Sequence, residues 1–212
     1  VVRMKNTKLL FPALQDQLFT IESIDIPDDR KGALDELVQY VSEKRDRKES
    51  IHLNFICTHN SRRSQLAQIW AQCMAAIYDV AVQCYSGGVE VTEFNSRAVE
   101  ALQSQGFEVI REGINNPHYY VCFSNDHPSV KCYSKVFDDQ PDGALPAFAA
   151  IMTCAHADEN CPVIVGAEKR FPVRYNDPKL FDGTDQESEK YTERSLQIAS
   201  EMMYVFSKIK NG

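Results

Sequence analysis

The stretch that most constrains the fold of this chain is a short polar loop, residues 57–63, placed between a predicted strand and a predicted helix. Residues 51–56 alternate apolar and polar side chains, as a strand does. After the loop, apolar side chains recur at helical spacing, at Leu66, Ile69, Trp70, Cys73, Met74 and Ile77. A strand that leads straight into a helix is typical of parallel α/β proteins.

The loop itself has the composition of an anion site. It reads Cys57-Thr58-His59-Asn60-Ser61-Arg62-Arg63 and is followed by Ser64. Backbone N–H groups at a helix N-terminus favour a tetrahedral anion, and they also favour a thiolate over a thiol. The guanidinium of Arg63 offers a planar fork for two oxygens, which a lysine lacks.

We therefore expect Cys57 to be a nucleophile and Arg63 to bind an oxyanion. We expect Asn60, Ser61 and Ser64 to hold the loop in shape and to donate to the thiolate. The alternative is a buried cysteine at a strand end beside a solvated arginine, and the position between strand and helix disfavours it.

Seven cysteines indicate a reduced compartment. The sequence shows no secretory signal and no long apolar span, and an odd number of cysteines does not suit a disulfide scaffold, so we expect a cytoplasmic protein with free thiols. Four of them lie in helix-like or strand-like apolar runs and are interpreted as core residues: Cys73, Cys84, Cys122 and Cys132.

Cys154 and Cys161 differ from the other cysteines. Cys154 follows the apolar run 148–153, so a parallel sheet would place it at the carboxyl edge, where ligands bind. Cys161 comes after a short polar segment, residues 155–160, that is compatible with helix or loop, and rearrangement of this segment would let the two sulfurs meet. With His156 they supply only three ligands and no paired Cys-x-x-Cys, so we expect no metal site.

Three segments carry a resemblance to a known superfamily. The loop sequence CTHNSRRSQLA resembles the phosphate-binding loop of the low-molecular-weight protein tyrosine phosphatases and of the thioredoxin-coupled arsenate reductases that share their fold. Residues 152–162 resemble the redox segment of the arsenate reductases. Asn176-Asp177-Pro178 resembles the Asp-Pro loop that carries the general acid in this superfamily. The resemblance runs from about residue 51 to the C-terminus.

The resemblance implies a cascade of three thiols. Cys57 would attack arsenate held by the loop and Arg63, while Asp177 protonates the departing oxygen. Cys154 would then attack Cys57 and release arsenite, and Cys161 would take over the disulfide for reduction by thioredoxin, without any cofactor. The alternative for Asp177 is a turn residue before Pro178.

Departures from the family pattern bear on two rival functions. Arg62 stands where the tyrosine phosphatases usually carry a second cysteine, which disfavours that class, and Gln68 replaces a glutamate that helps to hold potassium in some arsenate reductases. One rival is a tyrosine phosphatase that works through a Cys57 phosphocysteine. The other is a non-catalytic oxyanion-binding protein that uses residues 1–50 as an interface, which the presence of both Cys57 and Arg63 disfavours.

Length and charge agree with one globular domain and an extension. The chain has 212 residues, of which 43% are hydrophobic and 25% charged, enough for a sizeable core. Its net charge of −7 disfavours nucleic acids and anionic membranes as partners, so the attraction of an oxyanion must be local to the loop.

We predict an α/β fold with a central, mainly parallel twisted sheet and helices on both faces, like the low-molecular-weight phosphatases. Residues 1–50 form a helical extension packed on a catalytic domain of residues 51–212. The expected elements are an apolar lead-in at 9–26, helices at 28–45, 95–105 and 185–210, a strand at 80–85, and a hairpin of 118–123 with 131–137.

Overall fold

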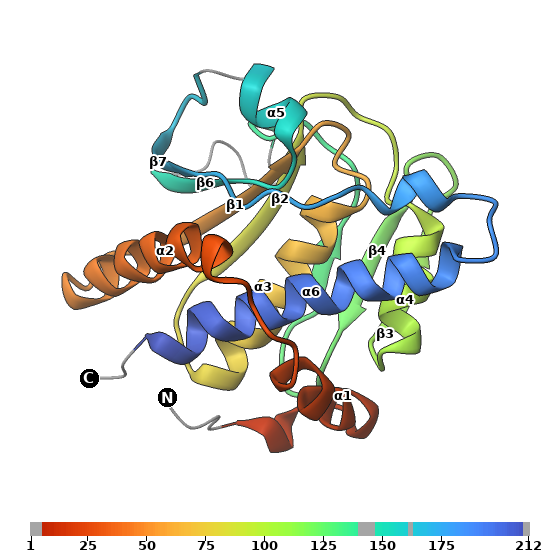
Figure 1. Cartoon of the computed structure of the whole chain (residues 1–212), viewed down its shortest axis with the longest axis horizontal. Coiled ribbons are helices and arrows are strands. Elements are labelled where there is room, and N and C mark those ends of the chain that lie inside the picture. Colours follow the sequence, from red (N-terminus) through yellow and green to blue (C-terminus); the bar gives the residue numbers. More distant parts are fainter. Residues whose placement is uncertain (1–5, 140–146, 161–162, 210–212) are drawn as a thin grey trace.

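The fold is described from a computed structural model, for residues 6–139, 147–160 and 163–209. A four-stranded sheet lies at its centre, in the order β2-β1-β6-β7, and all three neighbouring pairs are parallel (Figure 1). Its strands are β1 (His52–Cys57), β2 (Gln83–Gly88), β6 (Phe148–Met152) and β7 (Ala167–Phe171). The predicted parallel α/β sheet is confirmed.

Strand register brings the functional segments to one edge of this sheet. Cys57 is paired with Gly88, and Ile56 with Met152, so β1, β2 and β6 end at nearly the same level. Cys154 therefore follows its strand only a few residues from the loop that begins at Cys57. This is the carboxyl edge, where open parallel sheets bind ligands.

Helices cover both faces of the sheet, as expected. Leu53 and Phe55 of β1 face a large core together with α3 (Arg63–Tyr78) and α6 (Glu187–Lys208). On the opposite face, Ile56 of β1 and the alternate residues of β6 contact the short helix α5 (Ala155–Asn160) through Ala157. Because side chains of a strand alternate between faces, the uninterrupted apolar run of β6 fits burial on both sides.

The two large helices of the main core also meet through a buried polar link. The indole N–H of Trp70 on α3 donates to the hydroxyl of Ser195 on α6 at 2.9 Å, and that hydroxyl donates to Gln105 at 2.7 Å. All three side chains are buried. Tryptophan and serine can be buried here because each polar atom has a partner.

A second, three-stranded antiparallel sheet has the order β3-β4-β5. It consists of β3 (Glu108–Glu112), β4 (His118–Cys122) and β5 (Val130–Cys132). The pairing of β4 with β5 confirms the predicted hairpin. The second hairpin strand is shorter than predicted, since it ends at Cys132, and residues 133–137 instead run past the loop of residues 57–63.

The N-terminal residues form η1 (Thr7–Leu9), α1 (Pro12–Glu22) and α2 (Asp28–Asp46). Both α1 and α2 pack on α6. Arg30 on α2 forms a bidentate contact with Glu201 on α6, with both distances at 2.7 Å. The domain boundary at residue 50 stays a prediction, although these contacts agree with an extension that packs on the rest of the chain.

Capping residues that can be recognised in the sequence lie at both ends of α4 (Ser96–Ser104). The side chain of Asn95 accepts a hydrogen bond from the N–H of Arg97 and caps the start of this helix, and Gly106 follows with a φ of 101°. The last helix begins at Glu187 rather than at residue 185. None of the helices in the described part of the chain has the length and apolar character needed to span a bilayer.

Candidate active site

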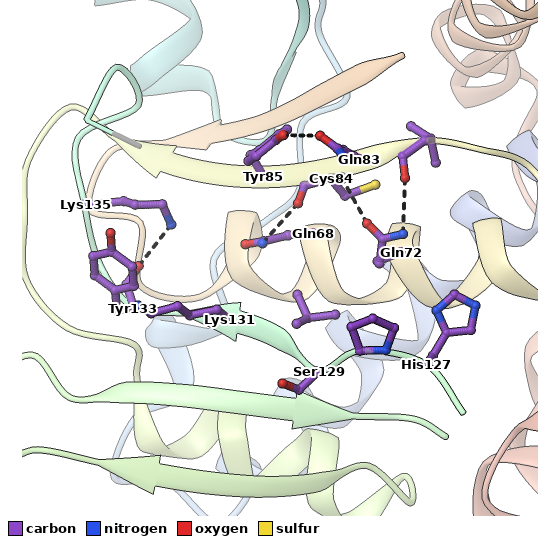
Figure 2. Close-up of a pocket in the computed structure, with 13 residues that line it drawn as sticks. Gln68, Gln72, Gln83, Cys84, Tyr85, His127, Ser129, Lys131, Tyr133 and Lys135 are labelled. Atoms are coloured by element: carbon purple, nitrogen blue, oxygen red, sulfur yellow. Dashed lines mark hydrogen bonds between the residues drawn. The ribbon is translucent and has the colours of Figure 1, made fainter. Parts of the chain in front are cut away.

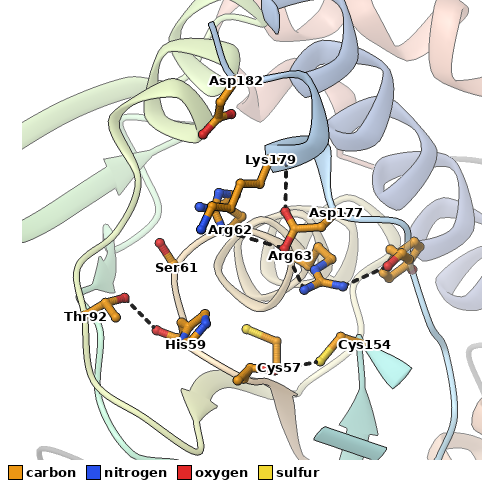
Figure 3. Close-up of polar contacts among 12 residues, drawn as sticks. Cys57, His59, Ser61, Arg62, Arg63, Thr92, Cys154, Asp177, Lys179 and Asp182 are labelled. Atoms are coloured by element: carbon orange, nitrogen blue, oxygen red, sulfur yellow. Dashed lines mark hydrogen bonds and ion pairs between the residues drawn. The ribbon is translucent and has the colours of Figure 1, made fainter. Parts of the chain in front are cut away.

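The loop from Cys57 to Arg63 connects β1 to α3 at the carboxyl edge of the central sheet (Figure 3). The sulfur of Cys57 lies 3.0 Å from the hydroxyl oxygen of Ser64. That oxygen also accepts a hydrogen bond from the side-chain amide of Asn60, at 2.9 Å. Ser64 therefore contacts the Cys57 sulfur, whereas Asn60 contacts Ser64 and does not donate directly to the sulfur as the sequence led us to expect.

Asn60 is the residue that shapes the loop. It is buried and has a φ of 46°, in the left-handed region that asparagine tolerates better than most residues. Its Oδ1 accepts hydrogen bonds from the backbone N–H of Lys135 at 3.1 Å and from the side chain of Gln65 at 3.2 Å. Neither of these partners was identified from sequence. Gln65 belongs to the loop motif, whereas no local signal marks Lys135.

Arg63 lies between two oxygens from a segment distant in sequence. One terminal nitrogen donates to the carbonyl of Tyr175 at 3.0 Å, and the other donates to Oδ2 of Asp177 at 2.8 Å. Asp177 thus lies at the loop, as the Asp-Pro resemblance implies. Its other oxygen accepts from the N–H of Lys179 at the start of η2 (Pro178–Phe181), so Asp177 both caps this turn and contacts Arg63.

Arg62 contributes a second guanidinium to the same carboxylate. A terminal nitrogen of Arg62 lies 3.6 Å from Oδ2 of Asp177, and its Nε donates to the hydroxyl of Tyr191 at 3.1 Å. The Tyr191 hydroxyl donates in turn to Asp182 at 2.8 Å. Burial first, and the bond to Asp182 second, raise the pKa of Tyr191 to about 12, so it stays a neutral donor. No local sequence signal marks Tyr191 as a site residue, because it lies on the apolar face of α6.

Cys154 contacts the loop through the side chain of Thr58. The hydroxyl oxygen of Thr58 is 3.4 Å from the sulfur of Cys154 and 3.2 Å from Nδ1 of His156. The backbone N–H of Ala157 also donates to the Cys154 sulfur, at 3.4 Å. Cys161 lies outside the described residues. His156 is exposed, yet it contacts the loop through Thr58.

The short helix that follows Cys154 is fixed by charges. The carboxylate of Asp158 accepts a hydrogen bond from Nε of Arg170 on β7, at 2.7 Å. It accepts another from Nε of Arg174, also at 2.7 Å. Asp158 is largely buried, so these two partners satisfy a carboxylate that would otherwise be costly to bury. They hold the segment that carries Cys154 against the sheet.

The remaining residues of the loop anchor its outer side. The hydroxyl of Ser61 donates to the carbonyl of Glu93 at 2.7 Å. The carbonyl of His59 accepts from the hydroxyls of Ser134 and Thr92, at 2.9 and 3.1 Å. The ring of His59 faces Glu90, with Nδ1 at 3.2 Å from the carboxylate. Ser61 and His59 thus support the loop backbone rather than the face that carries the Cys57 sulfur.

The other described cysteines behave as core residues, as interpreted from sequence. Cys73, Cys84 and Cys132 are buried. Burial raises the pKa of all three thiols, in Cys132 to about 12. Cys122 is half-buried, and burial raises the pKa of its thiol too. Near neutral pH they remain thiols, which are poor nucleophiles.

A cysteine and an arginine in a tight loop, beside a carboxylate and a second cysteine, are the groups of a thiol-based enzyme that acts on an oxyanion. Comparison with known proteins agrees with this class. Arsenate reductase 2 of Staphylococcus haemolyticus is 30% identical over 124 residues, which are 58% of this chain and 76% of that protein. Arsenate reductase of Bacillus licheniformis is 28% identical over 141 residues, which are 66% of this chain and 83% of that protein. These relatives are enzymes, and the chain belongs to their family, the arsenate reductases.

No protein-family model matches the chain. Among solved structures, a low-molecular-weight phosphotyrosine phosphatase from Vibrio cholerae aligns with a TM-score of 0.48 and 18% identity, over 74% of this chain and 94% of the other.

Proposed function

We propose that this protein reduces arsenate to arsenite, with Cys57 as the nucleophile and the loop with Arg63 as the oxyanion site. The observation that carries the proposal is the contact of Thr58 with the sulfur of Cys154. A phosphatase needs no second thiol at its nucleophile, whereas a reductase needs one to take up the oxidising equivalents.

In the first step, the Cys57 thiolate attacks arsenic and forms a sulfur–arsenic bond, and one arsenate oxygen departs as water after protonation. Asp177 is the proposed proton donor, since it lies at the loop beside Arg63. Arg63 already presents two parallel donors, to Tyr175 and Asp177, and this fork suits two oxygens of a tetrahedral anion.

In the second step, the thiolate of Cys154 attacks the sulfur of Cys57. A disulfide forms, the sulfur–arsenic bond breaks, and its electron pair stays on arsenic, which leaves as arsenite. Cys161 then attacks Cys154, so that the disulfide moves to Cys154–Cys161 and the Cys57 thiolate is regenerated. A dithiol protein of the thioredoxin class is the proposed reductant of that disulfide.

The test separates reduction from phosphate ester hydrolysis. Cys57→Ser is expected to abolish both activities, because a hydroxyl is a far weaker nucleophile than a thiolate. Cys154→Ser and Cys161→Ser are expected to stop multiple-turnover reduction of arsenate, coupled to thioredoxin, thioredoxin reductase and NADPH. Both should leave slow hydrolysis of an aryl phosphate intact.

Cys122→Ser is the matched control, because this half-buried thiol lies on β4 in the other sheet. It should reduce arsenate like the wild type. In Cys161→Ser, one arsenite per enzyme should be released and a Cys57–Cys154 disulfide should accumulate, as peptide mapping under non-reducing conditions would show. Wild-type turnover of arsenate by both Cys154→Ser and Cys161→Ser would refute the cascade and favour the tyrosine phosphatase alternative.

A further inference from the structure

A second cavity lies away from the loop, between the edges of the two sheets (Figure 2). It has a volume of about 610 Å³. One wall is β2, the edge strand of the central sheet, and the opposite wall is β5 with its flanking residues, at the edge of the small sheet. Helix α3 lies between them and contributes Gln68 and Gln72.

The charge of this cavity is opposite to that of the whole chain. Lys131 and Lys135 line it, and none of its described lining residues is acidic, although the net charge of the chain is −7. Both ammonium groups lie over the ring of Tyr133, with Nζ at 5.6 Å from the ring centre for Lys131 and 4.6 Å for Lys135. Two positive charges on one wall favour a doubly charged anion.

Lys135 is the residue that most needs a partner. Its exposed fraction is only 4%. In the described part of the chain, its ammonium donates only to the carbonyl of Tyr133, at a long 3.4 Å, while an ammonium has three donors. A buried charge with so few acceptors is costly unless a counter-ion is supplied. Burial, and to a lesser extent the charge of Lys131, lowers the pKa of Lys135 to about 8.

The amides on the helix wall are already engaged. The side chain of Gln72 donates to the carbonyl of Val82 at 3.3 Å and accepts from the N–H of Cys84 at 3.1 Å, as a neighbouring strand would. Gln68 donates to the carbonyl of Cys84 at 3.2 Å. These bonds cover the free edge of β2, so that wall is fixed and the lysines remain the groups that can bind a ligand.

Aromatic rings complete the lining. Tyr85 projects from β2, and His127 and Tyr133 lie on the side of β5 (Figure 2). The volume far exceeds that of an inorganic ion, and flat apolar faces suit a planar ring. We propose that this cavity binds an organic phosphate with a planar ring, such as a nucleoside monophosphate, whose phosphate pairs with Lys135 and Lys131.

A phosphate monoester is largely a dianion at neutral pH, so it matches the two ammonium groups in charge. The site is separate from the loop of residues 57–63 in its side chains, because Lys135 reaches Asn60 only through its backbone N–H. Replacement of the Lys135 side chain therefore leaves that loop contact in place. The proposal does not depend on arsenate reduction.

The experiment is calorimetric titration with adenosine 5′-monophosphate, inorganic phosphate and adenosine. We compare the wild type with Arg63→Ala, which disables the loop, and with Lys135→Met, which keeps the side-chain volume but removes the charge. We expect Arg63→Ala to bind the nucleotide like the wild type while losing inorganic phosphate. Lys135→Met should bind the nucleotide about tenfold or more weakly, the scale of one lost charge-assisted hydrogen bond.

Two further variants guard against a folding artefact. Lys131→Glu changes an exposed side chain and should also weaken nucleotide binding. Lys190→Met, which removes a half-buried ammonium of α6 that is paired with Glu193, should not. Adenosine should bind far more weakly than the nucleotide. The proposal is overturned if neither the wild type nor any variant binds the nucleotide. It is also overturned if binding is lost in Arg63→Ala but kept in both Lys135→Met and Lys131→Glu.

Discussion

The hydroxyl oxygen of Thr58 lies 3.4 Å from the sulfur of Cys154, although 96 positions separate the two residues in sequence. Thr58 follows Cys57 directly, so this contact joins the loop to the second thiol. The same oxygen lies 3.2 Å from Nδ1 of His156. A hydroxyl between a thiol and an imidazole can pass a proton from one to the other in the proposed attack of Cys154 on Cys57.

Thr58→Val should therefore slow the second step of the proposed reaction. We expect release of arsenite in a single turnover to fall roughly ten- to a hundredfold, the scale of a lost hydrogen bond to a charged group. Thr58→Ser keeps the hydroxyl and should stay near the wild-type rate. Hydrolysis of an aryl phosphate by Thr58→Val shows whether the loop is still intact, because that reaction does not need Cys154. If that hydrolysis falls as much as arsenite release, the role of Thr58 is structural.

Arg63→Lys should weaken oxyanion binding and the chemical step together. Lysine keeps the charge but lacks the planar fork of the guanidinium. It therefore cannot donate at once to the carbonyl of Tyr175, to Asp177 and to an oxyanion. We expect a loss of about a hundredfold in kcat/KM for arsenate, as for the removal of one oxyanion donor. Steady-state kinetics with the thioredoxin system measures it. A loss of less than threefold would show that charge alone suffices.

Gly88→Ala should displace the loop. A Cβ at Gly88 would lie 2.7 Å from the backbone N of Asn60 and 2.8 Å from the carbonyl oxygen of Thr58, and backbone cannot rotate away as a side chain can. We expect a loss of stability of about 1–3 kcal/mol, by analogy with other overpacking changes, together with weaker inhibition by phosphate. Urea unfolding and inhibition constants measure the two effects.

Gly32→Ala is the control for that change, because a Cβ at Gly32, inside α2, meets nothing within 4 Å. It should stabilise the protein by about 0.5–1 kcal/mol, since alanine is the better helix residue. Equal effects of the two substitutions would contradict the role given to Gly88.

Ser195→Ala should destabilise the protein without any change at the loop. It removes the acceptor of the Trp70 N–H and the donor to Gln105, and both groups stay buried. We expect a loss of about 2 kcal/mol in the free energy of unfolding, measured in urea. Ser200→Ala, whose hydroxyl only donates to the carbonyl of Gln197 on the same helix, is the comparison and should cost far less.

Lys135 should make the free energy of unfolding increase with pH. Its pKa is about 8 in the folded protein, against an ordinary value of 10.5 for lysine, and its charged or titratable neighbours are Lys131, Cys132 and Asp139. Between these values the unfolded chain binds more protons, so the free energy of unfolding increases as pH rises from 8 to 10.5. The penalty is fully present below pH 8. The difference between the wild type and Lys135→Met, followed by urea unfolding across this range, isolates the effect from other groups.

The sequence by itself determined those helices and strands that are marked by residues close together in the chain. The unit of β1, the loop and α3 follows from a change of apolar period within thirty residues, and Asn95 and Gly106 mark the ends of α4 because capping depends on adjacent residues. The resemblance of the loop and of the Asp-Pro segment also indicated Cys57, Arg63 and Asp177. Their roles, and that of Cys161, remain proposals that the experiments above test.

Tertiary structure decided what depends on distant segments. Strand β7 carries exposed charged residues such as Glu168 and Lys169, so it has no apolar run, and it is a strand because β6 offers it a free edge. The contacts of Asp177 with Arg63 and of Lys135 with Asn60 span 114 and 75 positions. Such pairings are set by the order of strands in the sheet and by the packing of α3 against α6. They therefore leave no periodic trace in the sequence, whereas helix caps and strand alternation do.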